Sequence, residues 1–116
     1  IGVRAIVAMT ESGGTARFLS RFRSQVPIFA MSRHDGARRR MTMMRDVVAY
    51  AFDSRGLSSR DAARSAIKEL YDQDALRVVD RVMFTSGDHM QQHGATNTLR
   101  LLQVGADGTA EGLGEL

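Results

Sequence analysis

Five short strand-like runs constrain the fold of this 116-residue chain more than any other feature. Residues 3–9 form a nearly continuous apolar run, and comparable runs cover 28–31, 47–52, 81–85 and 99–104. Runs of this length without strict polar alternation are typical of strands buried on both faces of a sheet. Because helical patterns separate the first four runs, the order of elements predicts an α/β domain with a mostly parallel sheet.

Three helices are predicted between these runs. Apolar residues at helical spacing indicate a helix over residues 15–23, which Pro27 ends. A second, short helix is expected over Ala37–Met44. The third begins after Ser58 or Ser59, either of which can cap it. Its pattern is the clearest, and it places these side chains on one face: Ala62, Ala63, Ala66, Ile67, Leu70 and Tyr71.

The last strand differs from the others because only a polar loop, residues 86–97, precedes it. A right-handed parallel crossover needs more chain than that, so we expect residues 99–104 to run antiparallel at a sheet edge. The tail over residues 105–116 is rich in glycine and acidic residues and is expected to be disordered. These expectations place one domain at residues 1–104.

The composition argues against several classes of protein. The chain has no cysteine, which leaves no disulfide framework and agrees with a cytoplasmic location. No apolar run approaches the roughly 20 residues of a membrane span, and no basic-then-apolar leader predicts secretion. The net charge of +3 is carried almost entirely by arginine and favours anionic ligands. Because the chain begins at Ile1, almost within a strand, we expect a domain excised from a longer protein.

The turn after the first strand is the strongest candidate for a binding site. Its glycines let the backbone approach a ligand, and free N–H groups at a helix start favour an anion. Its hydroxyls add donors, so the turn can cradle a phosphate, although it is not the GxxxxGK[ST] nucleotide loop. An ordinary strand-to-helix turn with capping hydroxyls explains the spacing equally well. The residues concerned are Thr10, Glu11, Ser12, Gly13, Gly14 and Thr15.

The long polar loop is a second candidate, because loops of this length in compact domains are often functional. The loop can close over a ligand held at the first turn, or it can simply connect two strands. Its candidate residues are Ser86, Gly87, Asp88, Gly94 and Thr96.

The remaining polar groups predict no chemistry. His89 and His93 have the spacing of a zinc pair, but no cysteine or nearby glutamate completes the set, so we expect no metal site. The run Arg38–Arg40 is expected to be a solvated face, and the lack of stacking aromatic residues nearby argues against nucleic acid. No catalytic triad or pair of carboxylates can be assembled. The residues alone indicate a phosphate-binding or structural domain without an evident enzyme site.

Three segments closely resemble the C-terminal domain of pyruvate kinases: Ala5–Ala16, Val26–His34 and Gly94–Arg100. They occur in the family's order and at its spacing, and the resemblance covers about residues 3–104. The segments Met-Thr-Glu-Ser-Gly and Phe-Ala-Met-Ser-Arg-His are most similar to the bacterial branch that sugar monophosphates or AMP activate.

The resemblance implies a three-layer fold of five strands in the order 3-2-1-4-5, with strand 5 antiparallel. It implies an allosteric effector phosphate on the turn Thr10–Thr15, where the strand order reverses, covered by the loop Ser86–Thr98. It also implies contact with a second copy across a two-fold axis. For that contact we expect the last strand, with Leu99, Leu101, Leu102 and Val104, and the short helix, with Met41, Met43 and Met44.

The parent enzyme of such a domain transfers phosphoryl from phosphoenolpyruvate to ADP, and its Mg²⁺ and K⁺ sites lie in a separate barrel. The resemblance therefore implies that this chain alone is inactive and holds no cofactor. Gly14 stands where family members often have arginine, which puts one phosphate contact in doubt. The activator-site arginine of some members has no certain match, and Arg60 and Arg64 are its candidates.

Three functions compete for this sequence. We favour a regulatory, effector-binding and subunit-association domain of pyruvate kinase over a free-standing protein that binds a small phosphorylated metabolite. A nucleic-acid binder is the third interpretation. We expect a sugar monophosphate or AMP as the effector, because Glu11 would repel the second phosphate of fructose 1,6-bisphosphate.

Overall fold

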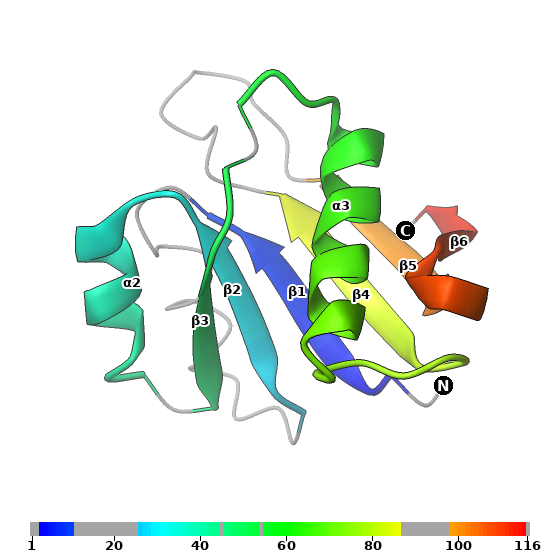
Figure 1. The fold of residues 1–116 in the computed structure, drawn as a ribbon, viewed down its shortest axis with the longest axis horizontal. Helices are drawn as coiled ribbons and strands as arrows, with labels where there is room; N and C mark the ends of the chain where they lie inside the picture. Colours follow the sequence, from blue (N-terminus) through cyan, green and yellow to red (C-terminus); the bar gives the residue numbers. More distant parts are fainter. Residues whose placement is uncertain (1–2, 11–25, 45, 54, 87–97, 116) are drawn as a thin grey trace.

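A six-stranded sheet organises the residues that the computed structural model describes, which are 3–10, 26–44, 46–53, 55–86 and 98–115. Its strands lie in the order β3-β2-β1-β4-β5-β6 (Figure 1). In chain order the strands are β1 (Ala5–Met9), β2 (Ile28–Ser32), β3 (Val47–Ala51), β4 (Arg81–Ser86), β5 (Thr98–Val104) and β6 (Ala110–Glu115). The described helices are α2 (Asp35–Met41), α3 (Ser59–Asp72) and a short 3-10 helix η2 (Ala106–Gly108).

The pairing of the strands confirms the predicted α/β class. Strands β1 to β4 run parallel to one another, and β5 runs antiparallel to β4, with Ser86 opposite Thr98. The order 3-2-1-4-5 therefore holds for the first five strands.

The expected strand count and the expected edge are wrong. Strand β6 pairs antiparallel with β5, with Val104 opposite Ala110 and Gln103 opposite Glu111. The sheet therefore has six strands instead of five, and β5 is not an edge strand. The tail expected to be disordered is a turn and a strand over residues 105–115. The physical reason is that the outer N–H and C=O groups of β5 need partners, which the returning tail supplies.

The return of the tail depends on a tight turn that packs against α3. Gly105 donates its N–H to the Thr109 carbonyl at 2.7 Å. Gly108 has a φ of +82°, and a Cβ added there would lie 2.6 Å from Tyr71 Cδ2. A residue without a side chain is therefore required at Gly108, both for the left-handed backbone and for the approach to the Tyr71 ring.

Two hydrophobic clusters cover the two faces of the sheet. Successive residues of β1 belong to different clusters, since Val7 lies in one and Ala8 in the other. The larger cluster packs under α3 and includes Ala66, Ile67, Leu70, Val82, Phe84, Leu102 and Val104. The smaller packs under α2 and comprises Ala8, Ile28, Ala30, Ala37, Met41 and Val47. The described helices thus lie on opposite faces, as a three-layer fold requires.

The helix boundaries follow local side-chain partners. Ser58 caps α3, accepting a hydrogen bond from the Asp61 N–H at 3.1 Å, which confirms one of the two predicted caps. Helix α2 begins at Asp35 instead of Ala37 and ends at Met41 instead of Met44. It begins earlier because the Asp35 carboxylate pairs with arginines of the following turn. The helix expected over residues 15–23 lies outside the described residues.

Candidate functional site at the carboxyl edge of the sheet

The carboxyl ends of the parallel strands meet at one edge of the sheet. Met9 near the end of β1 is opposite Met31 of β2 and Ser86 of β4, and Ser86 is in turn opposite Thr98 of β5. The chain leaves β1 toward β2 on one side and reaches β4 on the other, so the strand order reverses between β1 and β4. Open α/β sheets bind ligands in the crevice at such a reversal.

Thr10 and Ser86 are the predicted site residues that the structure describes. Thr10 is only 3% exposed, and its N–H donates to the Met31 carbonyl at 3.0 Å, which extends the β1–β2 ladder by one residue. Ser86 is the last residue of β4, on the strand beside β1. The strand ends that carry these two positions therefore lie side by side. The other predicted residues lie outside the described ranges: Glu11, Ser12, Gly13, Gly14, Thr15, Gly87, Asp88, Gly94 and Thr96.

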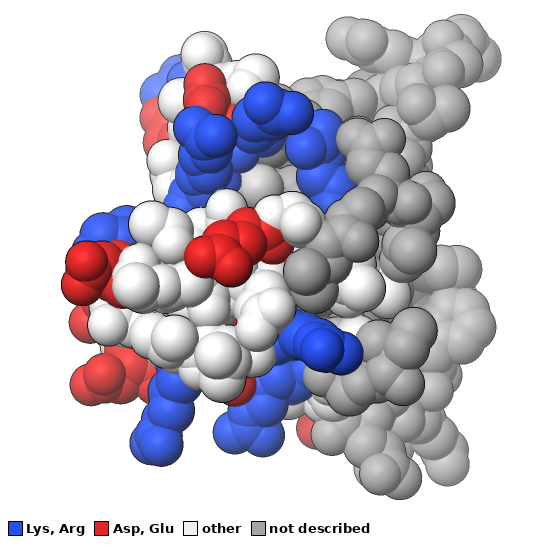
Figure 2. Space-filling model, turned by 90° about the vertical axis from the view of Figure 1, so that its right-hand side faces the viewer, with Lys and Arg blue, Asp and Glu red and all other residues white. Residues whose placement is uncertain are grey.

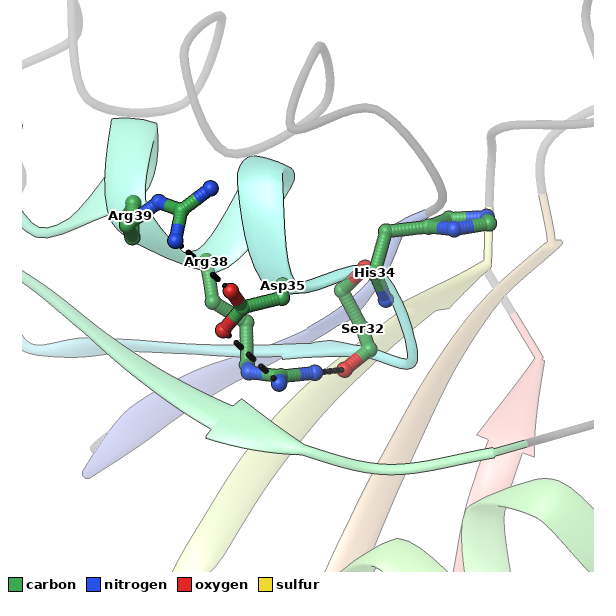
Figure 3. A network of polar contacts seen from close by, with 5 residues as sticks. All are labelled: Ser32, His34, Asp35, Arg38 and Arg39. Carbon is green, nitrogen blue, oxygen red and sulfur yellow. Dashed lines mark hydrogen bonds and ion pairs between the residues drawn. The ribbon is translucent and has the colours of Figure 1, made fainter.

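A polar network closes the turn after β2 at the same edge (Figure 3). Ser32 is buried; its Oγ accepts from the His34 N–H at 3.1 Å, and its carbonyl accepts from Arg38 Nη1 at 2.8 Å. Arg38 also pairs with Asp35 at 3.3 Å, and the His34 ring points away from that pair. This network holds the end of β2 beside Thr10.

The interpretation of Arg38–Arg40 as a solvated face therefore fails for Arg38. Its side chain is 25% exposed, against 75% for Arg39. The spacing of Asp35 to both arginines was visible in the sequence, but the Ser32 carbonyl was not a predictable partner.

An acidic residue at this edge, Asp53, has a lowered pKa. Asp53 follows β3, and hydrogen bonds from the side chain and backbone of Arg55 lower its pKa to about 2, with a smaller contribution from the positive charge of Arg33. A carboxyl with this pKa is ionised near neutral pH, so Asp53 serves as a partner for arginine and not as a proton donor.

Arg60 and Arg64, the candidates for an activator-site arginine, line a different hollow. Both lie on α3 and face a cleft of about 190 Å³ together with Arg100 of β5, and Thr10 is not among the described residues that line it. Within the described ranges, no group of three or more His, Asp or Glu side chains could hold a metal ion. No described helix is long and apolar enough to cross a membrane.

Fold and edge together define a class: an open, mostly parallel α/β domain whose candidate ligand site lies at the reversal of strand order. The chain belongs to the family described as the pyruvate kinase alpha/beta domain, whose model matches residues 1–102. The predicted family is thereby confirmed, whereas the branch activated by monophosphates or AMP stays a prediction.

Relatives of this chain are much longer proteins. The chain is 45% identical over 103 residues to "Pyruvate kinase II" of Salmonella typhimurium, covering 89% of this chain and 21% of that protein. It is 32% identical over 114 residues to "Pyruvate kinase" of Bacillus licheniformis, covering 98% and 19%. The chain thus spans about a fifth of the length of these relatives.

A solved structure supports the fold. The structure described as Cryptosporidium parvum pyruvate kinase in complex with ADP superposes with a TM-score of 0.73 at 20% identity, covering 87% of this chain and 20% of that one.

Proposed function

We propose that this chain is the regulatory domain of a pyruvate kinase and binds a phosphorylated effector at the turn after β1. The observation that carries the proposal is the reversal of strand order, which brings Thr10 and Ser86 onto adjacent strand ends in a member of this family. The buried position of Thr10 anchors the first residue of the turn, so that the glycines after it can present N–H groups to an anion.

The parent protein is proposed to be a cytoplasmic enzyme that transfers phosphoryl from phosphoenolpyruvate to ADP. Its active site, with Mg²⁺ and K⁺, would lie in a barrel outside this chain, which agrees with the fivefold greater length of the relatives. A coupled assay of the purified chain with phosphoenolpyruvate and ADP is expected to give no turnover. Turnover above that of a mock purification would contradict this part of the proposal.

The effector is proposed to be a sugar monophosphate or AMP. Glu11 adds a negative charge to the turn, and a carboxylate within about 4–6 Å of a second phosphate repels it. The 45% identity to a bacterial enzyme supports the bacterial branch. Calorimetry should compare glucose 6-phosphate, ribose 5-phosphate, AMP and fructose 1,6-bisphosphate. Tighter binding of the bisphosphate than of every monophosphate would refute the proposal.

The role of Glu11 can be isolated with a pair of charge reversals. Glu11→Lys should raise the affinity for the bisphosphate, whereas Glu69→Lys, the same change near the C-terminal end of α3, should not. Equal affinities of the two variants would show that Glu11 takes no part.

Subunit association is proposed to use the α2 end of the sheet. Strand β5 is already paired with β6, and at the α2 end the sheet ends with the edge strand β3. Two apolar side chains are exposed at this end: Val48 of β3 is 45% exposed, and Met43 after α2 is 86% exposed. Sedimentation of the chain should reveal self-association that Met43→Glu weakens. Val78→Glu, at an exposed apolar residue after α3, is the control, and an equal effect of both variants would argue against this surface.

A further inference from the structure

The cleft between α3, β5 and β6 combines three arginines with apolar residues in its lining. Arg60 and Arg64 come from the first two turns of α3, and Arg100 comes from β5. Figure 2 shows basic side chains gathered on the upper part of this face. Ala63, Leu102, Ala110 and Gly112 complete the lining.

The hollow exists because β6 has small residues where it faces α3. Ala110 is opposite Val104 and Gly112 is opposite Leu102, and these β5 residues pack into the core under α3. A Cβ added at Gly112 would meet no atom within 4 Å, so space remains beside Leu102. A small side chain at Gly112 can therefore be accommodated without displacing its surroundings.

The basic side chains along this side of α3 differ in whether they have a carboxylate partner. Lys68 continues the i, i+4 row of Arg60 and Arg64, and it pairs with Asp72 at 2.8 Å. That hydrogen bond raises the pKa of Lys68, and the negative charge of Asp107 on η2 adds to the effect. In the described part of the chain, by contrast, no hydrogen bond or ion pair involves the side chain of Arg60 or Arg64.

The charge pattern favours a bound anion. Like charges at i, i+4 on a helix repel each other, and an anion between Arg60 and Arg64 relieves that repulsion. Glu111 of β6 is exposed, its carboxylate lies close to Gly105, and it is not among the described residues that line the cleft. Arg100 has Glu115 as its register partner. The charge available to an anion is therefore that of Arg60 and Arg64, and Arg100 contributes to the wall of the cleft.

We propose that this cleft is a second anion site, which binds the phosphate group of a small phosphorylated metabolite. Two guanidinium forks match a dianionic phosphate monoester in charge and in hydrogen-bonding geometry. Ala63 and Leu102 provide an apolar surface for the carbon part of the ligand, and about 190 Å³ limits the ligand to a small one. The site goes beyond the effector turn, because it is built partly from β6, outside the residues that match the family.

The test is an NMR titration of the full chain at low salt with inorganic phosphate and with glycerol 3-phosphate. Saturable shifts are expected at the Nε–H groups of Arg60 and Arg64 and at the Gly112 N–H. The double variant Arg60→Gln/Arg64→Gln should weaken binding at least about tenfold, since it removes two charge-assisted contacts. Gly112→Glu should abolish binding by placing a carboxylate in the cleft. Arg77→Gln, the same charge loss beyond the far end of α3, should leave the affinity unchanged.

The outcome separates this site from the effector turn. The Thr10 N–H reports on the turn after β1, so either site can fail while the signals of the other still saturate. Equal affinities of the Arg60→Gln/Arg64→Gln and Arg77→Gln variants would overturn the proposal. So would a titration in which the Gly112 N–H does not shift.

Discussion

The arginines at the two ends of the sheet differ in their hydrogen-bond and ion-pair partners. At the α2 end, Arg38 binds the Ser32 carbonyl, Arg39 pairs with Asp35 at 2.8 Å, and Arg55 pairs with Asp53 at 2.7 Å. At the α3 end, no hydrogen bond or ion pair among the described residues involves the side chain of Arg60 or Arg64, although Asp61 lies three residues before Arg64. This difference shows that a consecutive run of arginines does not by itself indicate a binding surface. Arginines that reach a carboxylate, such as Arg39 and Arg55, belong to the scaffold, whereas arginines that reach none keep their charge available.

The largest effect on stability is expected at Gly108, in the turn that packs against α3. Gly108→Ala should lower the free energy of unfolding by about 2–3 kcal/mol, because it strains a left-handed backbone and collides with the Tyr71 ring. Denaturant unfolding monitored by circular dichroism measures it. Gly112→Ala, on the same hairpin but in open space, should change stability by less than about 0.5 kcal/mol. Similar losses in both variants would mean that η2 does not hold the tail against α3.

At the α2 end, the stability of the fold should depend more on Arg38 than on Arg39. Arg38→Gln should cost about 1.5 kcal/mol, because it removes a charged donor from the carbonyl of the buried Ser32. Arg39→Gln removes only an exposed ion pair and should cost less than about 0.5 kcal/mol. The midpoints of urea unfolding distinguish the two. If Arg39 proved the more costly loss, the assignment of Arg38 to the scaffold would be wrong.

A smaller effect is expected at the start of α3. Ser58→Ala should cost about 1 kcal/mol, because the Asp61 N–H loses its side-chain acceptor. Ser58→Asp keeps an acceptor at the cap and should remain close to the parent in thermal unfolding. A loss in the aspartate variant as large as in the alanine variant would show that the cap contributes nothing.

The smallest effect concerns pH. The pKa of Asp53 is lowered from 3.8 to about 2 in the folded chain, so its ion pair stabilises the fold above about pH 4 and that contribution disappears as the pH falls toward 2. In Arg55→Gln the pKa of Asp53 should return toward 3.8, as followed by its carboxyl resonance. The stability difference between the parent and this variant should shrink on acidification. A difference that is the same at pH 2 and pH 6 would contradict the assigned pair.

Most of the sheet could be predicted from local pattern, and the last strand could not. Apolar runs and the Ser58 cap are properties of neighbouring residues, so they are visible in the sequence. Strand β6 contains Gly112 and Gly114 and two glutamates, a composition that is poor in strand-forming residues. Strand β6 forms because β5 offers it N–H and C=O groups to pair with. The composition of the tail does not reveal that pairing.

The candidate site was predictable to a similar extent. Thr10 and Ser86 were placed together because parallel strands end at one edge, which follows from topology alone. The role of Arg38 depends on the path of the turn after β2, and the cleft beside Arg60 depends on β6, so neither follows from spacing. Glu11 to Thr15 stay a prediction.

Strand β6, which lies beyond the residues that match the family, contributes both to the sheet edge and to the cleft. Strand β6 shields the edge of β5 from other chains, and its Ala110 and Gly112 form one wall of the arginine cleft. Recombination or engineering that exchanged this tail for another would therefore alter, in a single step, the chain's tendency to aggregate through an open edge and the shape of its cleft. Solubility and ligand selectivity of this domain are thus linked traits, and a screen of tail variants for one should be scored for the other.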